Sequence, residues 1–142
     1  MKFSLTEQER MIQNTARDFA RKELAPVALE ANEKGFFPAE IYGKLAELGF
    51  LGITVPETYG GVALDTFSLM LVIEEIAAVC ASTAVTLSVH NSLTNWCILH
   101  YGSEDARARY LPRLASGEIL GAYAITESEA GSDVAAMRMT AA

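Results

Sequence analysis

Residues 76–103 contain no Asp, Glu, Lys or Arg, and this long uncharged run limits the possible folds more than any other stretch. Such a run can cross a membrane or lie inside a protein. Its polar side chains decide between the two, because an unpaired polar group is costly in hydrocarbon. They are Ser82, Thr83, Thr86, Ser88, His90, Asn91, Ser92, Thr94 and Asn95. The run therefore predicts two helices buried inside a soluble bundle.

A first helix is expected near the beginning of the chain. Thr6 and Glu9 have the spacing of a capping box, which predicts a helix start. Apolar residues then recur at helical spacing: Met11, Ile12, Thr15, Ala16, Phe19 and Ala20. Pro26 is expected to break or restart this helix, and Gly35 to cap its end.

A second, antiparallel helix is expected from Pro38 to Gly49. Its buried stripe is Ile41, Tyr42, Leu45 and Leu48. Residues Phe50–Val55 are apolar and β-branched, and the sequence predicts an extended connector there. The pair Gly60-Gly61 follows as a turn that requires positive φ.

The uncharged run and its flanks predict three more helices. Asp65 is expected to cap a helix reaching Cys80, in which Glu74 or Glu75 faces solvent or a neighbouring basic side chain. Ser82 or Thr83 caps the next helix, which reaches about His100 and is closed by Gly102. A short helix begins at Ser103-Glu104-Asp105 and ends at Ser116-Gly117.

The pattern changes after residue 117. Ile119–Thr126 is typical of a strand, Glu127–Asp133 of a polar turn, and Met137–Thr140 of a second strand. The predicted fold is mainly α, an antiparallel helical bundle (residues 1–117) followed by the first strands of a truncated β-domain (residues 118–142). A lone hairpin is marginal in water, so we expect the N-terminal part of a longer protein.

Charge and cysteine content exclude several classes of protein. The net charge of −7 argues against nucleic acid or an anionic membrane as partner, because both attract clustered Lys and Arg. Cys80 and Cys97 lack the spacing of a metal site, so reduced core thiols are expected. No leader is recognisable after Met1, which predicts a cytoplasmic protein.

The segment Tyr123–Asp133 contains Tyr-x-x-Thr-Glu followed by Ala-Gly-Ser-Asp, and a Gly-Ser-Asp turn can direct backbone N–H groups at a phosphate. This string resembles the flavin-binding segment of the acyl-CoA dehydrogenase family. Other stretches resemble the same family in the same order: Val55–Gly61, Ala81–Val85, Asn91–Leu93, Tyr101–Glu104 and Tyr110–Pro112. The helix around residues 81–93 is most similar to short-chain members.

The resemblance implies FAD-dependent α,β-dehydrogenation of an acyl-CoA thioester, with electrons passed to an electron-transfer flavoprotein. The implied cofactor-binding residues are Tyr123, Ala124, Ile125, Thr126, Glu127, Ser128, Glu129, Ala130, Gly131 and Ser132. The Thr126 hydroxyl would bond the pyrimidine end of the flavin, while Gly131 and Ser132 would contact phosphate. Ser132 would also touch substrate, and Thr86, Leu87 and His90 would border the acyl tail, although a buried histidine is more often a core residue.

The resemblance also implies a homotetramer whose catalytic carboxylate lies outside these 142 residues, so that this chain alone is inactive. No metal is implied. Ser128 and Glu129 depart from the family, which usually has proline and a small residue there. Acyl-CoA oxidases and flavin monooxygenases share the scaffold and stay as alternatives, as does a helical interaction module without chemistry.

Overall fold

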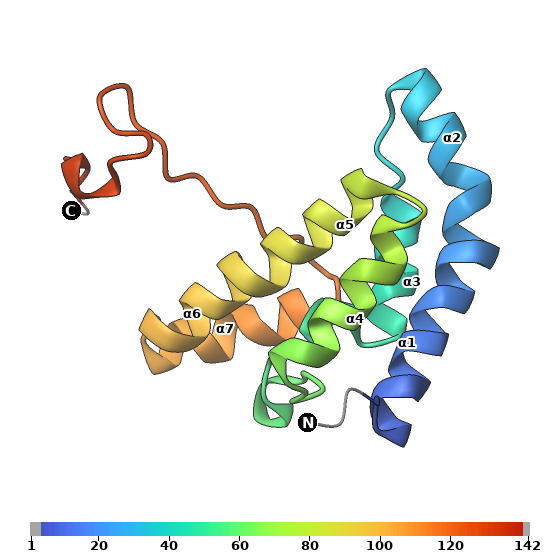
Figure 1. Cartoon of the computed structure of the whole chain (residues 1–142). Coiled ribbons are helices and arrows are strands. Elements are labelled where there is room, and N and C mark those ends of the chain that lie inside the picture. Colours follow the sequence, from blue (N-terminus) through green and yellow to red (C-terminus); the bar gives the residue numbers. More distant parts are fainter. Residues whose placement is uncertain (1–3, 141–142) are drawn as a thin grey trace.

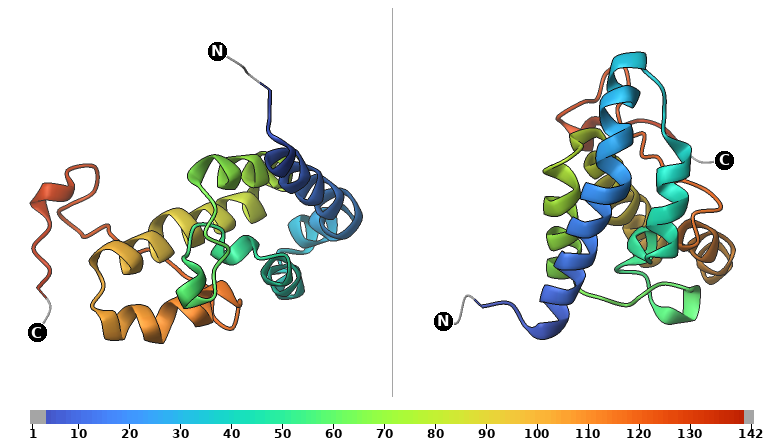
Figure 2. Two further views of the ribbon diagram at one scale, coloured as in Figure 1. Left: turned by 90° about the horizontal axis from the view of Figure 1, so that it is seen from below. Right: turned by 90° about the vertical axis from the view of Figure 1, so that its right-hand side faces the viewer.

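The structure, a computed structural model, describes residues 4–140. It is a bundle of α-helices from which the C-terminal segment projects (Figure 1). One long rod forms an edge of the bundle and consists of α1 (Glu7–Phe19), a π-helical segment (Ala20–Leu24) and α2 (Ala25–Lys34). The right-hand view of Figure 2 shows this rod along its length.

The ends of this first rod follow the sequence signals. Thr6 Oγ1 accepts the Glu9 N–H at 3.2 Å, and the Glu9 carboxylate accepts the Thr6 N–H at 2.6 Å, which confirms the capping box. Gly35 closes α2 at φ 66°. Pro26 lies in the first turn of α2, so a helix does restart there. The chain nevertheless stays helical across the π segment, because Ala25 N–H bonds the carbonyl of Ala20.

The connector after α3 (Ala39–Glu47) differs from the sequence prediction. Phe50–Gly52 forms a 3₁₀ turn, and Phe50, Leu51, Ile53 and Val55 are all buried. The expectation of an extended connector at Phe50–Val55 is therefore wrong. The backbone N–H and carbonyl groups of an apolar run that enters the core need hydrogen-bond partners. Here the turn supplies one of them, because Gly52 N–H donates to the Gly49 carbonyl at 3.1 Å.

A second short 3₁₀ turn, Glu57–Tyr59, leads into the double glycine. Gly60 has φ 79°, as expected, but Gly61 does not have positive φ. Gly61 is required for a different reason, since a Cβ there would lie 2.0 Å from the Val55 carbonyl oxygen. The expectation of positive φ thus holds for only one glycine of the pair.

Helix α4 (Thr66–Ala77) packs between the first rod and α5. Asp65 caps it by accepting the Ser68 N–H at 2.9 Å, as predicted. Glu75 receives two hydrogen bonds from the Arg17 guanidinium, at 2.9 and 2.6 Å, and this pair ties α4 to α1. The prediction that one glutamate of this helix meets a neighbouring base is confirmed.

A second long rod crosses the bundle and consists of α5 (Ala81–Ser88), a π-helical segment (Val89–Asn95) and α6 (Trp96–Tyr101). Cys80 occupies the N-cap position of this rod, and its side chain makes no capping hydrogen bond. The predicted N-cap at Ser82 or Thr83 is therefore wrong. Thr83 instead donates its hydroxyl to the Cys80 sulfur at 3.3 Å. Gly102 ends the rod, as predicted. Within residues 4–140, no helix combines the length and the apolar character needed to span a membrane.

Helix α7 (Glu104–Ala115) runs beside α6, capped by Ser103 and followed by Gly117 at φ 74°. The core lies where the two rods, α3, α4 and the Phe50–Gly52 turn meet. Its largest fully buried apolar side chains include Leu24, Leu45, Leu51, Ile53, Leu69, Ile76 and Leu87.

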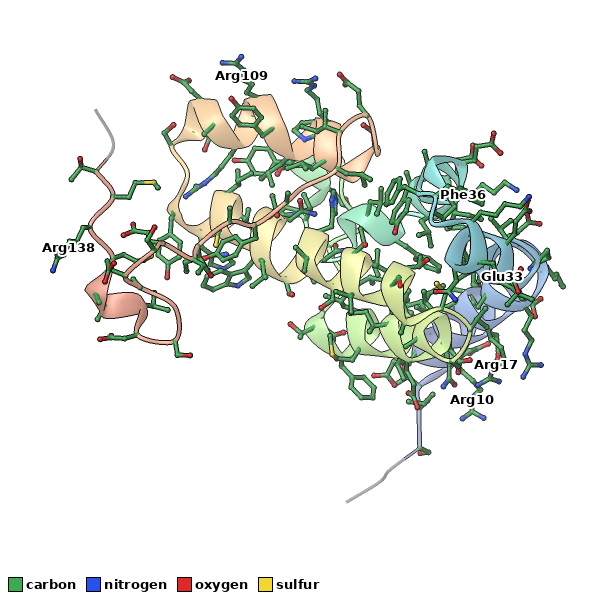
Figure 3. The ribbon with its side chains drawn as sticks, turned by 90° about the horizontal axis from the view of Figure 1, so that it is seen from above. Arg10, Arg17, Glu33, Phe36, Arg109 and Arg138 are labelled. Carbon is green, nitrogen blue, oxygen red and sulfur yellow. The ribbon has the colours of Figure 1, made fainter. Side chains whose placement is uncertain are left out.

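Residues 118–140, which we call the tail, leave the bundle along the second rod and then extend away from it (Figures 1 and 2). Figure 3 shows Arg138 on the tail, far from Arg17 and Phe36 on the opposite side of the bundle. The described part of the chain contains no strand, so the strands expected at Ile119–Thr126 and Met137–Thr140 are not formed. A strand exists only when its backbone pairs with another, and the only helical element in residues 118–140 is a 3₁₀ turn at Val134–Ala136.

Candidate functional site

The tail begins in contact with the second rod. The Gly121 N–H donates to His90 Nδ1 at 3.0 Å, and the Thr94 hydroxyl donates to the Ala122 carbonyl at 3.3 Å. Cys97 raises the pKa of the Tyr123 phenol. The first residues of the tail thus rest along one side of this rod.

The next residues carry little structure of their own. Tyr123, Ala124 and Thr126 are exposed, and only Ile125 is half-buried. The Thr126 hydroxyl forms no hydrogen bond within residues 4–140. This stretch therefore offers a free hydroxyl and free backbone groups to any ligand that lies against it.

A tight turn follows, closed by two reciprocal backbone bonds. Glu127 N–H donates to the Ala130 carbonyl at 2.9 Å, and Ala130 N–H donates back at 3.3 Å. The Glu127 carboxylate also accepts the N–H groups of Arg138 and Met139, both at 2.9 Å. Glu127 thus holds the far end of the tail against the turn, a role that the sequence does not reveal because its partners are backbone groups ten or more residues away.

The expected phosphate-contacting residues, Gly131 and Ser132, are exposed beyond this turn. Their N–H groups donate no hydrogen bond within residues 4–140, and a Cβ on Gly131 would meet nothing within 4 Å. Free N–H groups and a free hydroxyl suit an anion. Glu129 and Asp133, which flank them, are exposed carboxylates that oppose it.

The three rod residues expected near the acyl tail have different surroundings. Leu87 and His90 are completely buried in the bundle, whereas Thr86 is half-buried and donates its hydroxyl to the Ser82 carbonyl at 3.1 Å. Thr86 lines a cavity of about 240 Å³ between the two rods and α3. Other residues around it include Phe37, Tyr42, Cys80 and Thr83. No hydrogen bond within the described range joins Tyr123–Ser132 to Thr86 or Leu87.

The π segment of the second rod buries three polar side chains. Asn91 Nδ2 donates to the Phe50 carbonyl at 3.0 Å, and Asn95 Nδ2 donates to the Leu51 carbonyl at 2.8 Å. Burial lowers the pKa of His90, and the Leu114 and Leu51 carbonyls offset only part of that effect. Sequence reasoning missed Asn91 and Asn95 as the residues that hold the Phe50–Gly52 turn, since only the tertiary structure brings these carbonyls to the rod.

Few side chains among residues 4–140 are candidates for an acid–base or metal-binding role. Glu75 is committed to Arg17, whose guanidinium holds the pKa of that carboxyl below its ordinary value. Glu74 is exposed on α4. No group of three or more His, Cys, Asp and Glu side chains in this range can hold a metal ion.

Comparison with known proteins identifies the family of the chain. Residues 6–118 match the family profile described as acyl-CoA dehydrogenase, N-terminal domain. An acyl-CoA dehydrogenase of Bacillus subtilis is 43% identical over 137 residues, which cover 96% of this chain and 36% of that protein. The human mitochondrial short-chain specific acyl-CoA dehydrogenase is 40% identical over 137 residues, or 96% of this chain and 33% of its own length. The chain thus spans about a third of the curated relatives it matches.

Solved structures match as well. Butyryl-CoA dehydrogenase from Megasphaera elsdenii superposes with a TM-score of 0.89 at 35% identity, covering 97% of this chain and 37% of that one. An acyl-CoA dehydrogenase from Bacillus anthracis, solved in complex with FAD, has a TM-score of 0.86 at 36% identity and covers 94% and 23%. Given the profile match, the identities and the shared helical bundle, the chain belongs to the acyl-CoA dehydrogenase family and contains its N-terminal domain.

Proposed function

We propose that this chain is the N-terminal portion of an FAD-dependent dehydrogenase that introduces an α,β double bond into an acyl-CoA thioester. The observation that carries the proposal is the 43% identity to an acyl-CoA dehydrogenase over 96% of the chain. A span of this length includes most of the tail. Electrons would pass to an electron-transfer flavoprotein, and the whole enzyme would be a cytoplasmic homotetramer acting on short acyl chains.

The tail fits a flavin nucleotide in the groups that it leaves free. Thr126 and Ser132 have exposed side chains, and the N–H groups of Gly131 and Ser132 have no acceptor within residues 4–140. We assign Tyr123–Ser132 to FAD, with Thr126 at the pyrimidine end and Gly131 and Ser132 at the phosphates. FAD supplies the hydride-accepting chemistry of the reaction when it is bound.

The protein's own residues would position the ligands and exclude water. The second rod exposes three large apolar side chains, Val85, Leu93 and Trp96, by 61%, 37% and 42%. Exposed apolar side chains of this size on one element are typical of a surface that a ligand or another domain covers. Thr86, which follows Val85 in the chain, is the residue proposed nearest the acyl chain, while Leu87 and His90 support the rod from inside.

Glu129 changes the electrostatics of the phosphate end. Its carboxylate and that of Asp133 flank the free N–H groups, so the segment on its own repels an anion in part. We therefore propose that the 142-residue chain alone binds FAD weakly and has no dehydrogenase activity, with cationic groups and the catalytic carboxylate supplied by other parts of the enzyme.

The test uses the full-length protein that carries this chain. Wild type should purify with bound FAD, oxidise a short acyl-CoA with an artificial electron acceptor and react slowly with oxygen when reduced. The double variant Thr126→Ala, Ser132→Ala should lose most of its FAD and keep its fold. A colourless wild type that takes up no added FAD, or a double variant with unchanged affinity, contradicts the proposal. Rapid reaction with oxygen would instead identify an oxidase or a monooxygenase.

A further inference from the structure

His90 is one of two histidines in the chain, and its side chain has no exposed surface. Its Nδ1 accepts the Gly121 N–H at 3.0 Å, so the ring proton of the neutral imidazole sits on Nε2. Nε2 has no partner at hydrogen-bonding distance and angle within residues 4–140, although the Leu114 and Leu51 carbonyls act on the ring and raise its pKa in part. The hydrogen bond of this buried imidazole therefore joins it to Gly121, in the first part of the tail.

The contact at His90 is one of two in a row. Thr94, four residues further along the rod, donates its hydroxyl to the Ala122 carbonyl. Gly121 fits closely there, because a Cβ on it would lie 2.6 Å from Thr94 Cγ2. Two consecutive tail residues thus follow one side of the rod, and we call His90, Thr94, Gly121 and Ala122 the exit latch.

The exit latch lies directly before the segment assigned to FAD. Tyr123 follows Ala122 without a residue between them. Within residues 4–140, two side chains of the rod hydrogen-bond residues 118–122: buried His90 accepts the Gly121 N–H, and half-buried Thr94 donates to the Ala122 carbonyl. A segment whose own residues are mostly exposed depends on such contacts for its direction. The lone pair of His90 Nδ1 is therefore one of two side-chain contacts that fix where the segment begins, and it is the buried one.

We propose that His90 is a positioning residue, whose Nδ1 lone pair fixes the start of Tyr123–Ser132 on the second rod and so presents that segment to FAD. This rests on the proposed function for its flavin half. The protonated ring donates from both nitrogens and cannot accept the Gly121 N–H, so the latch requires neutral imidazole. Burial, which disfavours the charged ring, maintains that state.

Two substitutions separate the acceptor from the packing. In His90→Asn, Oδ1 takes the place of Nδ1, one bond beyond Cγ, so the acceptor is retained. In His90→Leu, a methyl group occupies that place, so the side chain is apolar and has no acceptor. A purely structural role of a buried side chain favours the leucine variant, because a partly satisfied amide is costly in a core. Positioning favours the asparagine variant.

The first measurement needs no flavin. Hydrogen exchange of the Gly121 N–H in the 142-residue chain should be slow in wild type and in His90→Asn, and about three- to tenfold faster in His90→Leu, as expected for loss of one hydrogen bond. His100→Ala changes the exposed second histidine and should leave this rate unchanged. The ¹⁵N shifts of wild-type His90 should report an unprotonated Nδ1, a measurement that requires no variant to fold. Fast exchange in wild type, or a protonated Nδ1, overturns the latch.

The second measurement is FAD affinity of the full-length protein, read by the quenching of flavin fluorescence. His90→Leu should bind FAD about three- to tenfold more weakly, whereas His90→Asn and His100→Ala should stay within about twofold of wild type. Equal loss in both His90 variants, or better binding by the leucine variant, overturns positioning by the acceptor. If wild type binds no FAD, the proposed function and the flavin half of this inference fail together, while the exchange of Gly121 still decides the latch.

Discussion

The two long rods share one backbone device and use it differently. Each is an α-helix interrupted by a π segment, Ala20–Leu24 in the first and Val89–Asn95 in the second. In the first rod, Ala20 and Leu24 are buried while Arg21, Lys22 and Glu23 face solvent. In the second rod, the π segment buries His90, Asn91 and Asn95.

This difference shows what a π segment contributes in each place. The first buries Ala20 and Leu24 in the core, while its charged side chains stay exposed and include Glu23, which pairs with Lys44 of α3. The second directs polar side chains at backbone groups of the Phe50–Gly52 turn and of the tail. A π segment inside an α-helix is often found at a functional site, and here the second rod is the one that hydrogen-bonds the tail.

The largest expected effect falls on the first rod's buried side. Leu24 has no exposed surface and lies among the core residues. Leu24→Ala should lower the free energy of unfolding by about 3 kcal/mol through lost burial and the cavity left behind. Urea unfolding of the chain measures this. A loss below about 1 kcal/mol would mean that this π segment does not hold the core.

A smaller but more specific effect is expected at Asn95. Asn95→Ala leaves the buried Leu51 carbonyl without its donor and should cost about 2 kcal/mol. Asn95→Asp should cost more, since a carboxylate then faces that carbonyl. If urea unfolding shows that Asn95→Asp is as stable as wild type, the hydrogen bond from the Asn95 amide to the Phe50–Gly52 turn is not what stabilises the second rod.

The two rods should also respond differently to acid. Burial keeps the pKa of His90 below its ordinary 6.5, so the unfolded chain binds this proton more readily than the folded chain. The stability that depends on neutral His90 is complete above pH 6.5 and declines as the pH falls below it. Urea midpoints measured from about pH 7 to pH 5 should decline in wild type, and less in His90→Asn.

Two hydrogen-bonded carboxylates, Glu75 and Asp65, do not interfere in that pH range. The pKa values of Glu75 and Asp65 are lowered from 4.5 and 3.8 by their hydrogen bonds to Arg17 and Ser68, so their contribution is lost only at more acidic pH. His100→Ala serves as the matched control and should keep the wild-type slope. An equal slope in wild type and His90→Asn would contradict the assignment to His90.

The smallest effect is expected on the wet side of the first π segment. Lys22 pairs with Asp18 at 2.8 Å, and both side chains are about two-thirds exposed, so water and salt screen the attraction. Lys22→Ala should leave the urea midpoint close to that of wild type, and added salt should not change the difference. A large loss would show that the exposed side of this π segment also contributes to stability.

Sequence patterns predicted the helical class and many helix ends. The capping residues Thr6, Asp65 and Ser103 lie where their side chains reach an N–H three residues further on. The site was foreseen less completely. The motif around Tyr123–Asp133 marked a candidate segment, but no pattern indicated that Glu127 would bind the N–H groups of Arg138 and Met139.

Local chemistry alone therefore determined the start of three helices and the left-handed turns at Gly35, Gly49 and Gly60, because every atom involved lies within a few residues. Only the tertiary structure decided that Phe50–Val55 turns instead of extending, that the tail forms no strand within residues 4–140, and that His90 accepts from Gly121. Each of these depends on a hydrogen-bond partner far away in the chain, and spacing in sequence carries no information about which distant backbone group will arrive there.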